Sequence, residues 1–118
     1  MDVRPRTIIC DIDGVLIKHH GDITKQHLIS PEILPGVIDK IKEWDLEGCK
    51  IILMTGRRES VRSQTEIQLA NAGIFYDHLI MGISGGVRVL INDKKPDGIN
   101  DTAIAINLNR NKGFENVL

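Results

Sequence analysis

Short apolar runs alternate along this chain with stretches of mixed polarity. Two runs, at residues 7–11 (TIICD) and 50–54 (KIILM), are rich in β-branched residues and predict buried strands. Residues 76–81 and 87–91 (VRVLI) predict a third and a fourth strand, and residues 102–108 a fifth. Strands separated by other elements are typical of a mostly parallel sheet.

Two of the intervening stretches have apolar residues at three- and four-residue steps, which indicates amphipathic helices. One begins at Val37 and is expected to end at Gly48, and the other covers Glu59–Ala72 and stops at Gly73. Residues 14–34 are predicted to form a long loop. Right-handed crossovers then predict an α/β fold with helices on both faces of the sheet.

The chain has 118 residues, which fits a single domain over residues 1–118. Its formal net charge of -1 gives no basic field, so we expect no nucleic acid or anionic membrane as a partner. No apolar run is long enough to span a membrane, and no signal peptide is visible, which predicts a cytoplasmic protein. Cys10 and Cys49 are expected to be reduced, packed thiols.

Three polar clusters directly follow three of the predicted strands. They are Asp11–Gly14, Thr55–Arg57 and Asn92–Lys94. The carboxyl ends of parallel strands lie at one edge of a sheet, which is where α/β proteins bind their ligands. The three clusters are therefore expected to meet.

The chemistry of these clusters indicates a phosphate site. Asp11 and Asp13 project to the same side of an extended chain, where two close carboxylates favour a hard cation such as Mg²⁺. Asp93 offers a further oxygen. Thr55 and the Gly56 amide are suited to hold phosphate oxygens. A carboxylate facing phosphate is a nucleophile, and a second carboxylate serves as acid and base.

Each cluster alone also has a structural interpretation. Asp and Gly are common turn residues, and Thr55 is a reasonable N-cap for the following helix. Asn92-Asp93 alone is more typical of a turn than of a ligand. The order of the three clusters, each at the end of a strand, favours the phosphate and metal site.

The sequence resembles the haloacid dehalogenase (HAD) superfamily at these positions. DIDGVL (residues 11–16) looks like its first motif, MTGR (54–57) like its second and IND (91–93) like its fourth. The resemblance spans roughly residues 7–108. It implies a three-layer Rossmann-like HAD core with a mostly parallel sheet and no cap domain.

The resemblance also implies roles for individual residues. Asp11 would be the nucleophile, Asp13 the general acid/base, and Mg²⁺ the cofactor. The candidate phosphate-binding residues are Thr55, Gly56, Arg57 and Lys94, and the candidate metal ligands are Asp11, Asp13, Asn92 and Asp93.

The chain departs from the family pattern at two positions. Asn92 stands where a second acidic residue is common, and Asp97 is the alternative. The third-motif lysine is not found in residues 81–86 (MGISGG). The cations that can replace it are Arg88, Lys94, Lys95, Arg58 and Arg62.

Together these features predict a Mg²⁺-dependent phosphomonoester hydrolase that forms an aspartyl-phosphate. A sugar phosphate, a nucleotide or another small phosphorylated metabolite is the expected substrate, and the capless architecture leaves room for a homo-oligomer. The alternative is a degenerate module that binds a phosphorylated ligand without turnover. The missing lysine favours the module, whereas intact Asp11 and Asp13 favour the enzyme.

Overall fold

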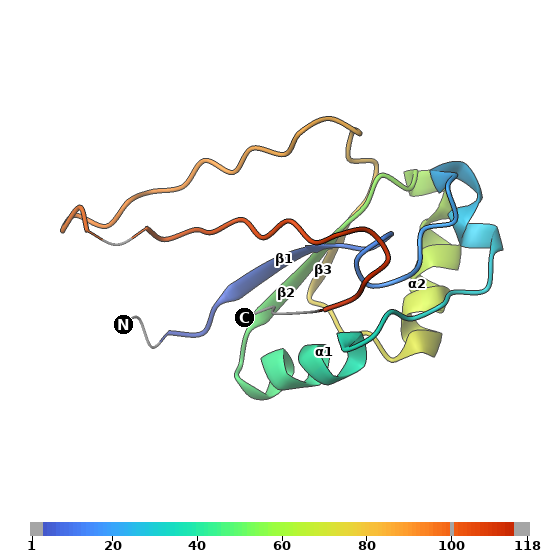
Figure 1. The fold of residues 1–118 in the computed structure, drawn as a ribbon, viewed down its shortest axis with the longest axis horizontal. Helices are drawn as coiled ribbons and strands as arrows, with labels where there is room; N and C mark the ends of the chain where they lie inside the picture. Colours follow the sequence, from blue (N-terminus) through green and yellow to red (C-terminus); the bar gives the residue numbers. More distant parts are fainter. Residues whose placement is uncertain (1–3, 100, 115–118) are drawn as a thin grey trace.

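The computed structural model describes residues 4–99 and 101–114, which fold around a small parallel sheet (Figure 1). The sheet contains β1 (Thr7–Asp11), β2 (Lys50–Met54) and β3 (His78–Ile80), in that order. Asp11 is aligned with Met54 across the first pair of strands. The carboxyl ends of the strands therefore lie at one edge, as the sequence predicts, and the α/β fold class is confirmed.

Both predicted helices are present. Helix α1 spans Val37–Leu46, and α2 spans Arg62–Ala72 after a short 3-10 helix, η2 (Glu59–Val61). The predicted loop between β1 and α1 contains one more 3-10 helix, η1 (Ile23–Leu28). This loop holds no cap domain, in line with the sequence prediction. We call residues 18–34 the η1 loop.

The two faces of the sheet differ in burial. Cys10, Leu53 and Leu79 lie side by side on one face and belong to the hydrophobic core, which also contains Trp44 of α1 and Leu69 of α2. The chain crosses from β1 to β2 and from β2 to β3 in the same direction. Right-handed connections then place both helices on the same face.

The opposite face of the sheet is less covered. It carries Ile9 and Ile80, each 47% exposed. Helices on both faces, as the sequence predicts, would require a strand on the other side of β1. The part of the chain that the structure describes supplies none there.

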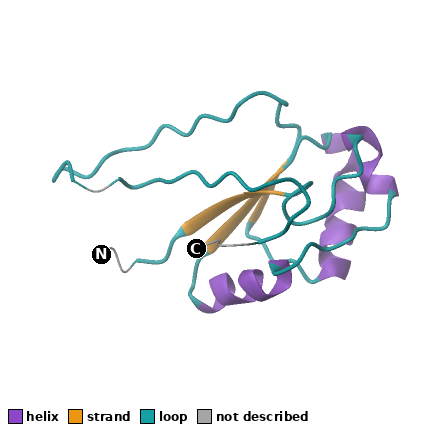
Figure 2. Ribbon diagram, viewed as in Figure 1, coloured by secondary structure: helices purple, strands orange, loops and turns teal. Residues whose placement is uncertain are grey.

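Residues 84–99 and 101–108, here called the arm, stand in place of the predicted fourth and fifth strands. The arm leaves the end of the sheet, runs past the amino end of β1 and returns without regular secondary structure (Figures 1 and 2). Val87 is 93% exposed and Ile91 91% exposed. The prediction of strands at residues 87–91 and 102–108 is therefore wrong: these side chains are apolar, but no sheet edge pairs with them.

Hydrogen bonds fix the arm where it leaves and rejoins the body. The Gly82 amide donates to the Arg57 carbonyl (2.8 Å), and the Asn111 amide donates to the Gly14 carbonyl (2.8 Å). Beyond the arm, Phe114 packs on Trp44 with ring centroids 5.5 Å apart. The segment after β3 is thus anchored to both polar loops at the carboxyl edge.

Cys10 and Cys49 are free and buried, as the sequence predicts. None of the helices formed by the described residues has the length and apolar character that crossing a bilayer requires.

Candidate functional site

Asp11 is the partly exposed carboxylate of the carboxyl edge. It ends β1, and its Oδ1 accepts a hydrogen bond from the Ile12 amide (3.0 Å). Arg88, at the start of the arm, places Nη1 3.5 Å from Asp11 Oδ2, and 31% of the Asp11 side chain remains exposed. Burial raises the pKa of Asp11, and the positive charge of Arg88 opposes this increase. Asp11 is therefore accessible to a ligand and lies beside one cation.

Asp13 has a different environment. Its side chain is only 3% exposed and binds the guanidinium of Arg57 at two points. Arg57 Nε donates to Oδ2 (3.0 Å) and Nη2 donates to Oδ1 (2.8 Å), a charge-assisted, two-pronged geometry. The Thr55 hydroxyl donates to Oδ2 as well (3.4 Å). A carboxylate has about four acceptor positions, so one remains for water or substrate.

The backbone after β2 is arranged to hold Arg57 inside the protein. Thr55 is fully buried, and its hydroxyl accepts the Arg57 amide (3.1 Å). Its carbonyl accepts the Ile83 amide (3.0 Å), which closes the loop after β3 over this turn. A Cβ at Gly56 would lie 3.4 Å from the Ile83 carbonyl oxygen, so the two loops are in van der Waals contact here. Thr55 and Arg57 thus orient Asp13, and their contact with phosphate stays a prediction.

The outer nitrogen of Arg57 is held by helix α2. Nη1 donates to Thr65 Oγ1 (3.1 Å) and to Gln68 Oε1 (2.5 Å). Sequence reasoning missed Thr65 and Gln68. A signal for them does exist, because they are polar residues three positions apart that share the buried side of the helix with apolar Leu69.

The loop after Asp13 turns away sharply. Gly14 has φ of +89°, a conformation that suits glycine, and the side chain of Arg110 covers it at 3.2 Å from where a Cβ would lie. Asn111 fixes the next part of the loop by accepting the His19 amide (2.7 Å) and donating to its carbonyl (3.0 Å). Arg110 therefore lies near the site, which the sequence did not indicate.

The third polar cluster does not join the other two. Asn92 donates to Thr102 Oγ1 (2.5 Å), and Thr102 in turn donates to the Asp93 carbonyl, so these residues bind within the arm. Lys94 lies 3.8 Å from Asp101, also in the arm. The expectation that all three clusters meet is therefore wrong in this structure, because it depended on residues 87–91 forming a fourth parallel strand.

This placement bears on the predicted metal site. Within residues 4–99 and 101–114, no group of three or more acidic, histidine or cysteine side chains is arranged to hold a metal ion. Asp13 is bound to Arg57, Asp11 lies beside Arg88, and Asp93 is in the arm. The side chains as arranged do not fit Mg²⁺, and the ligand roles of Asn92 and Asp93 stay predictions.

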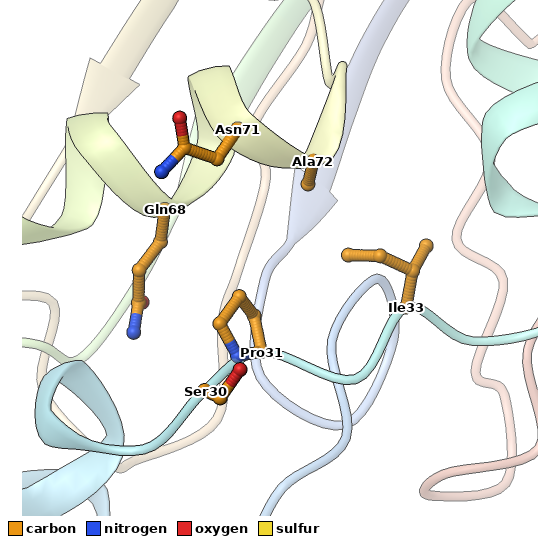
Figure 3. A pocket seen from close by; sticks show the side chains of 6 residues that line it. All are labelled: Ser30, Pro31, Ile33, Gln68, Asn71 and Ala72. Carbon is orange, nitrogen blue, oxygen red and sulfur yellow. The ribbon is translucent and has the colours of Figure 1, made fainter.

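A shallow cavity of about 310 Å³ lies on the other side of Gln68, between α2 and the η1 loop (Figure 3). Its lining residues are Ser30, Pro31, Ile33, Gln68, Asn71 and Ala72. It does not include Asp11 or Asp13. Gln68 is thus shared between this cavity and the Arg57 network.

Comparisons with known proteins find similarity at the level of structure. No family model matches the sequence, and no curated protein does. A chain of the Pnkp1/Rnl/Hen1 complex is similar, with 31% identity and a TM-score of 0.59 over 72% of this chain. A chain of the Pnkp1/Rnl/Hen1 RNA repair complex has 31% identity and a TM-score of 0.57 over 71%.

The D,D-heptose 1.7-bisphosphate phosphatase from B. bronchiseptica, complexed with magnesium and phosphate, is a more distant neighbour. It has 20% identity and a TM-score of 0.47, and the match covers 64% of this chain and 49% of the phosphatase. The chain spans 30% and 28% of the two RNA repair complex chains. The similarity to the two RNA repair complex chains supports the α/β fold and does not identify an activity.

Proposed function

We propose that this chain hydrolyses phosphomonoesters and that Asp11 is the nucleophile that accepts the phosphoryl group. The observation that carries the proposal is the contrast between two carboxylates at one sheet edge. Asp11 is partly exposed beside Arg88, whereas Asp13, two residues later, is buried and fixed by Arg57. Two carboxylates in different environments are suited to different tasks in one reaction.

Arg88 supplies the positive charge for which the sequence has no third-motif lysine. Its Nη1 lies 3.5 Å from Asp11 Oδ2, so a phosphate at Asp11 would meet the guanidinium as well. Arginine binds phosphate through a planar, two-pronged set of donors. This charge offsets the repulsion between an anionic nucleophile and an anionic substrate.

The reaction has two steps. In the first, an Asp11 oxygen attacks phosphorus, the P–O ester bond breaks, and the leaving oxygen takes a proton from Asp13. In the second, a water oxygen attacks phosphorus, the bond to Asp11 breaks, and the water proton passes to Asp13. The acyl phosphate is hydrolysed, and both aspartates return to their starting state.

Mg²⁺ is part of the sequence prediction, and when bound it would neutralise phosphate charge. No step above passes through a metal, because the described carboxylates do not form a metal site in this arrangement. Assays with Mg²⁺ and with EDTA therefore test whether turnover needs Mg²⁺.

A second candidate is a module that binds a phosphorylated ligand without turnover. It is favoured by the hydrogen bonds of Asp13, since both of its oxygens are engaged by Arg57 and Thr55. A proton on Asp13 must take the one acceptor position that these three bonds leave open, or displace one of them. The ligand would still bind beside Arg88, but Asp13 would act only as a structural anion.

A phosphate-release screen separates the two candidates. The panel contains sugar phosphates, nucleotides, p-nitrophenyl phosphate and an oligonucleotide with a terminal phosphate, each with Mg²⁺ and with EDTA. The oligonucleotide is included because two similar chains belong to complexes named for Pnkp1, Rnl and Hen1, one of them called an RNA repair complex. The expectation of no nucleic-acid partner is tested by the same sample.

The decisive variant is Asp11→Asn. Its matched control is Asp45→Asn, because Asp45 is exposed on α1. We expect turnover in the native protein and in Asp45→Asn, and none in Asp11→Asn. Turnover that survives in Asp11→Asn rules out this nucleophile. Phosphate binding without release by folded native protein supports the binding module.

A further inference from the structure

The Gln68 side chain joins two parts of the protein that are distant in sequence. Its Nε2 donates to the carbonyls of Gln26 (3.3 Å), His27 (3.2 Å) and Ile29 (2.9 Å), all in the η1 loop. Its Oε1 accepts Arg57 Nη1 at 2.5 Å. In Figure 3 the side chain extends from α2 towards the segment that carries Ser30 and Pro31.

We propose that Gln68 is a positioning residue that couples the η1 loop to Arg57 and, through Arg57, to Asp13. The proposal rests on the proposed function, because it gives Asp13 a role in turnover. It adds that the conformation of the η1 loop controls the orientation of Asp13. A substrate that contacts this loop would thereby adjust the acid/base group.

Arg57 has little freedom to change its orientation. The residue is 1% exposed, and its Nε and two Nη atoms donate to Asp13, Thr65 and Gln68. A buried guanidinium held at this many points has one orientation, since each lost bond leaves a desolvated polar group. Any shift of the Gln68 amide therefore shifts Arg57.

Gln68 itself is placed by the loop. An amide has donors and an acceptor on one rigid group, so it can connect carbonyl oxygens to a guanidinium. Methionine has a similar length but no such donors, and glutamate has the acceptor without the donors. Gln68→Met therefore removes the contacts with both the loop and Arg57, whereas Gln68→Glu removes only the donors that bind the loop.

Gln26 connects the interior of the η1 loop to its exposed first residues. Gln26 is 2% exposed; its Nε2 donates to the Lys18 carbonyl (2.7 Å), and its Oε1 accepts the His20 amide (3.0 Å). Residues 18–20 follow Asp13 closely in sequence and lie at the surface around the site. A contact made at Lys18–His20 is thus transmitted through Gln26 to the carbonyls that bind Gln68.

The test uses Gln68→Met and Gln68→Glu, with Gln64→Met as the matched control, because Gln64 is exposed on the same helix. In steady-state assays on the best substrate of the screen, Gln68→Met is expected to lower kcat about 10-fold with little change in KM. Misplacing a catalytic group slightly can cost up to about 10²-fold. Gln68→Glu keeps the acceptor for Arg57 and is expected to retain kcat within about 3-fold.

Hydrogen exchange tests the connection independently of activity, and a double-mutant cycle tests it through kcat. In NMR spectra, the Arg57 Nε–H proton should exchange faster with solvent in Gln68→Met than in native protein or Gln64→Met. In a double-mutant cycle, Gln68→Met should not lower kcat further in an Arg57→Lys background, because Gln68 acts through Arg57. Amides of residues 26–29 should exchange faster in both Gln68 variants.

Each outcome has one meaning. Unchanged kcat and unchanged Arg57 exchange in folded Gln68→Met overturn the proposal. An equal loss of kcat in Gln68→Met and Gln68→Glu also overturns the proposal, since the hydrogen bond from Arg57 to residue 68 would then not affect turnover. If the native protein releases no phosphate, the proposed function fails, and the Arg57 exchange rates still decide whether Gln68 positions Arg57.

Discussion

Arg57 binds Asp13 across 44 positions of sequence with two hydrogen bonds of 3.0 and 2.8 Å. The pair joins the loop after β1 to the loop after β2, and both side chains are nearly inaccessible. Removing one member of a buried pair leaves the other desolvated and uncompensated. The carboxyl edge of the sheet therefore depends on this contact for its shape, whatever reaction takes place there.

Arg57→Ala tests that dependence. We expect the free energy of unfolding to fall by about 3–5 kcal/mol, because Asp13 would be left as a buried unpaired charge. Denaturant titration at pH 7 measures the change. The control is Arg6→Ala, which removes an exposed ion pair with Glu47 and should have little effect. Equal losses in the two variants would contradict the structural role of Arg57.

Asp11→Asn is expected to stabilise the protein at neutral pH. Burial raises the pKa of Asp11, so ionising this carboxyl is harder in the folded protein than in the unfolded chain. The folded state is therefore favoured below the unfolded pKa of about 3.9, and this stability is lost as pH rises through the higher folded pKa. Asparagine, which does not ionise, avoids that loss.

The measurement is the melting temperature of Asp11→Asn and of native protein between about pH 3 and 8. This range covers the pH at which carboxyl groups titrate. The variant should melt higher above the Asp11 pKa, and the difference should shrink as the pH falls. Asp45→Asn serves again as control. A native protein that melts higher than Asp11→Asn at pH 7 would mean that the Asp11 charge is stabilising.

Arg88→Ala is expected to change both the pH profile and substrate affinity. The charge of Arg88 opposes the rise in the Asp11 pKa, so its removal should raise that pKa further. If Asp11 must be ionised to attack, the acid limb of kcat/KM should move to higher pH. KM should rise at every pH, because the phosphate loses its arginine. The Arg6→Ala variant controls for net charge, and an unmoved acid limb would exclude the role proposed for Arg88.

The sequence predicted those parts of the structure that depend on neighbours close in the chain. Short apolar runs located β1 and β2, and helical spacing located both helices, because those patterns reflect which parts of each element are buried. The pairing of Arg57 with Asp13 was not predicted. It brings together residues 44 positions apart, and the sequence equally allowed Arg57 to face solvent or phosphate.

The arm shows the limit of composition as a guide to pairing. Residues 87–91 have strong β propensity, yet a strand forms only where a partner supplies backbone hydrogen bonds. Within the part of the chain that the structure describes, β1 pairs with β2 alone, and the arm does not pair with its other edge. Asn92, Asp93 and Lys94 follow this segment, so their distance from Asp11 has the same cause.

A pair of isoleucine substitutions tests the arm directly. Ile91 is 91% exposed in the arm, and Ile51 is 2% exposed in β2. Ile51→Ala should lower the free energy of unfolding by about 2–5 kcal/mol, as expected for a buried isoleucine. Ile91→Ala should change it by less than about 0.5 kcal/mol, because an exposed side chain loses no packing. Denaturant titrations of both variants provide the numbers.

The result for Ile91 also bears on the metal prediction. A loss at Ile91 comparable to that at Ile51 would show that residues 87–91 are buried in solution, against another part of this chain or a second copy. Light scattering on the native protein then distinguishes these two, because burial against a second copy doubles the mass. Burial within a single chain would change where Asp93 lies and would reopen its candidacy as a ligand. A negligible loss would indicate that the arm is exposed in solution, with Asp93 away from Asp11 and Asp13.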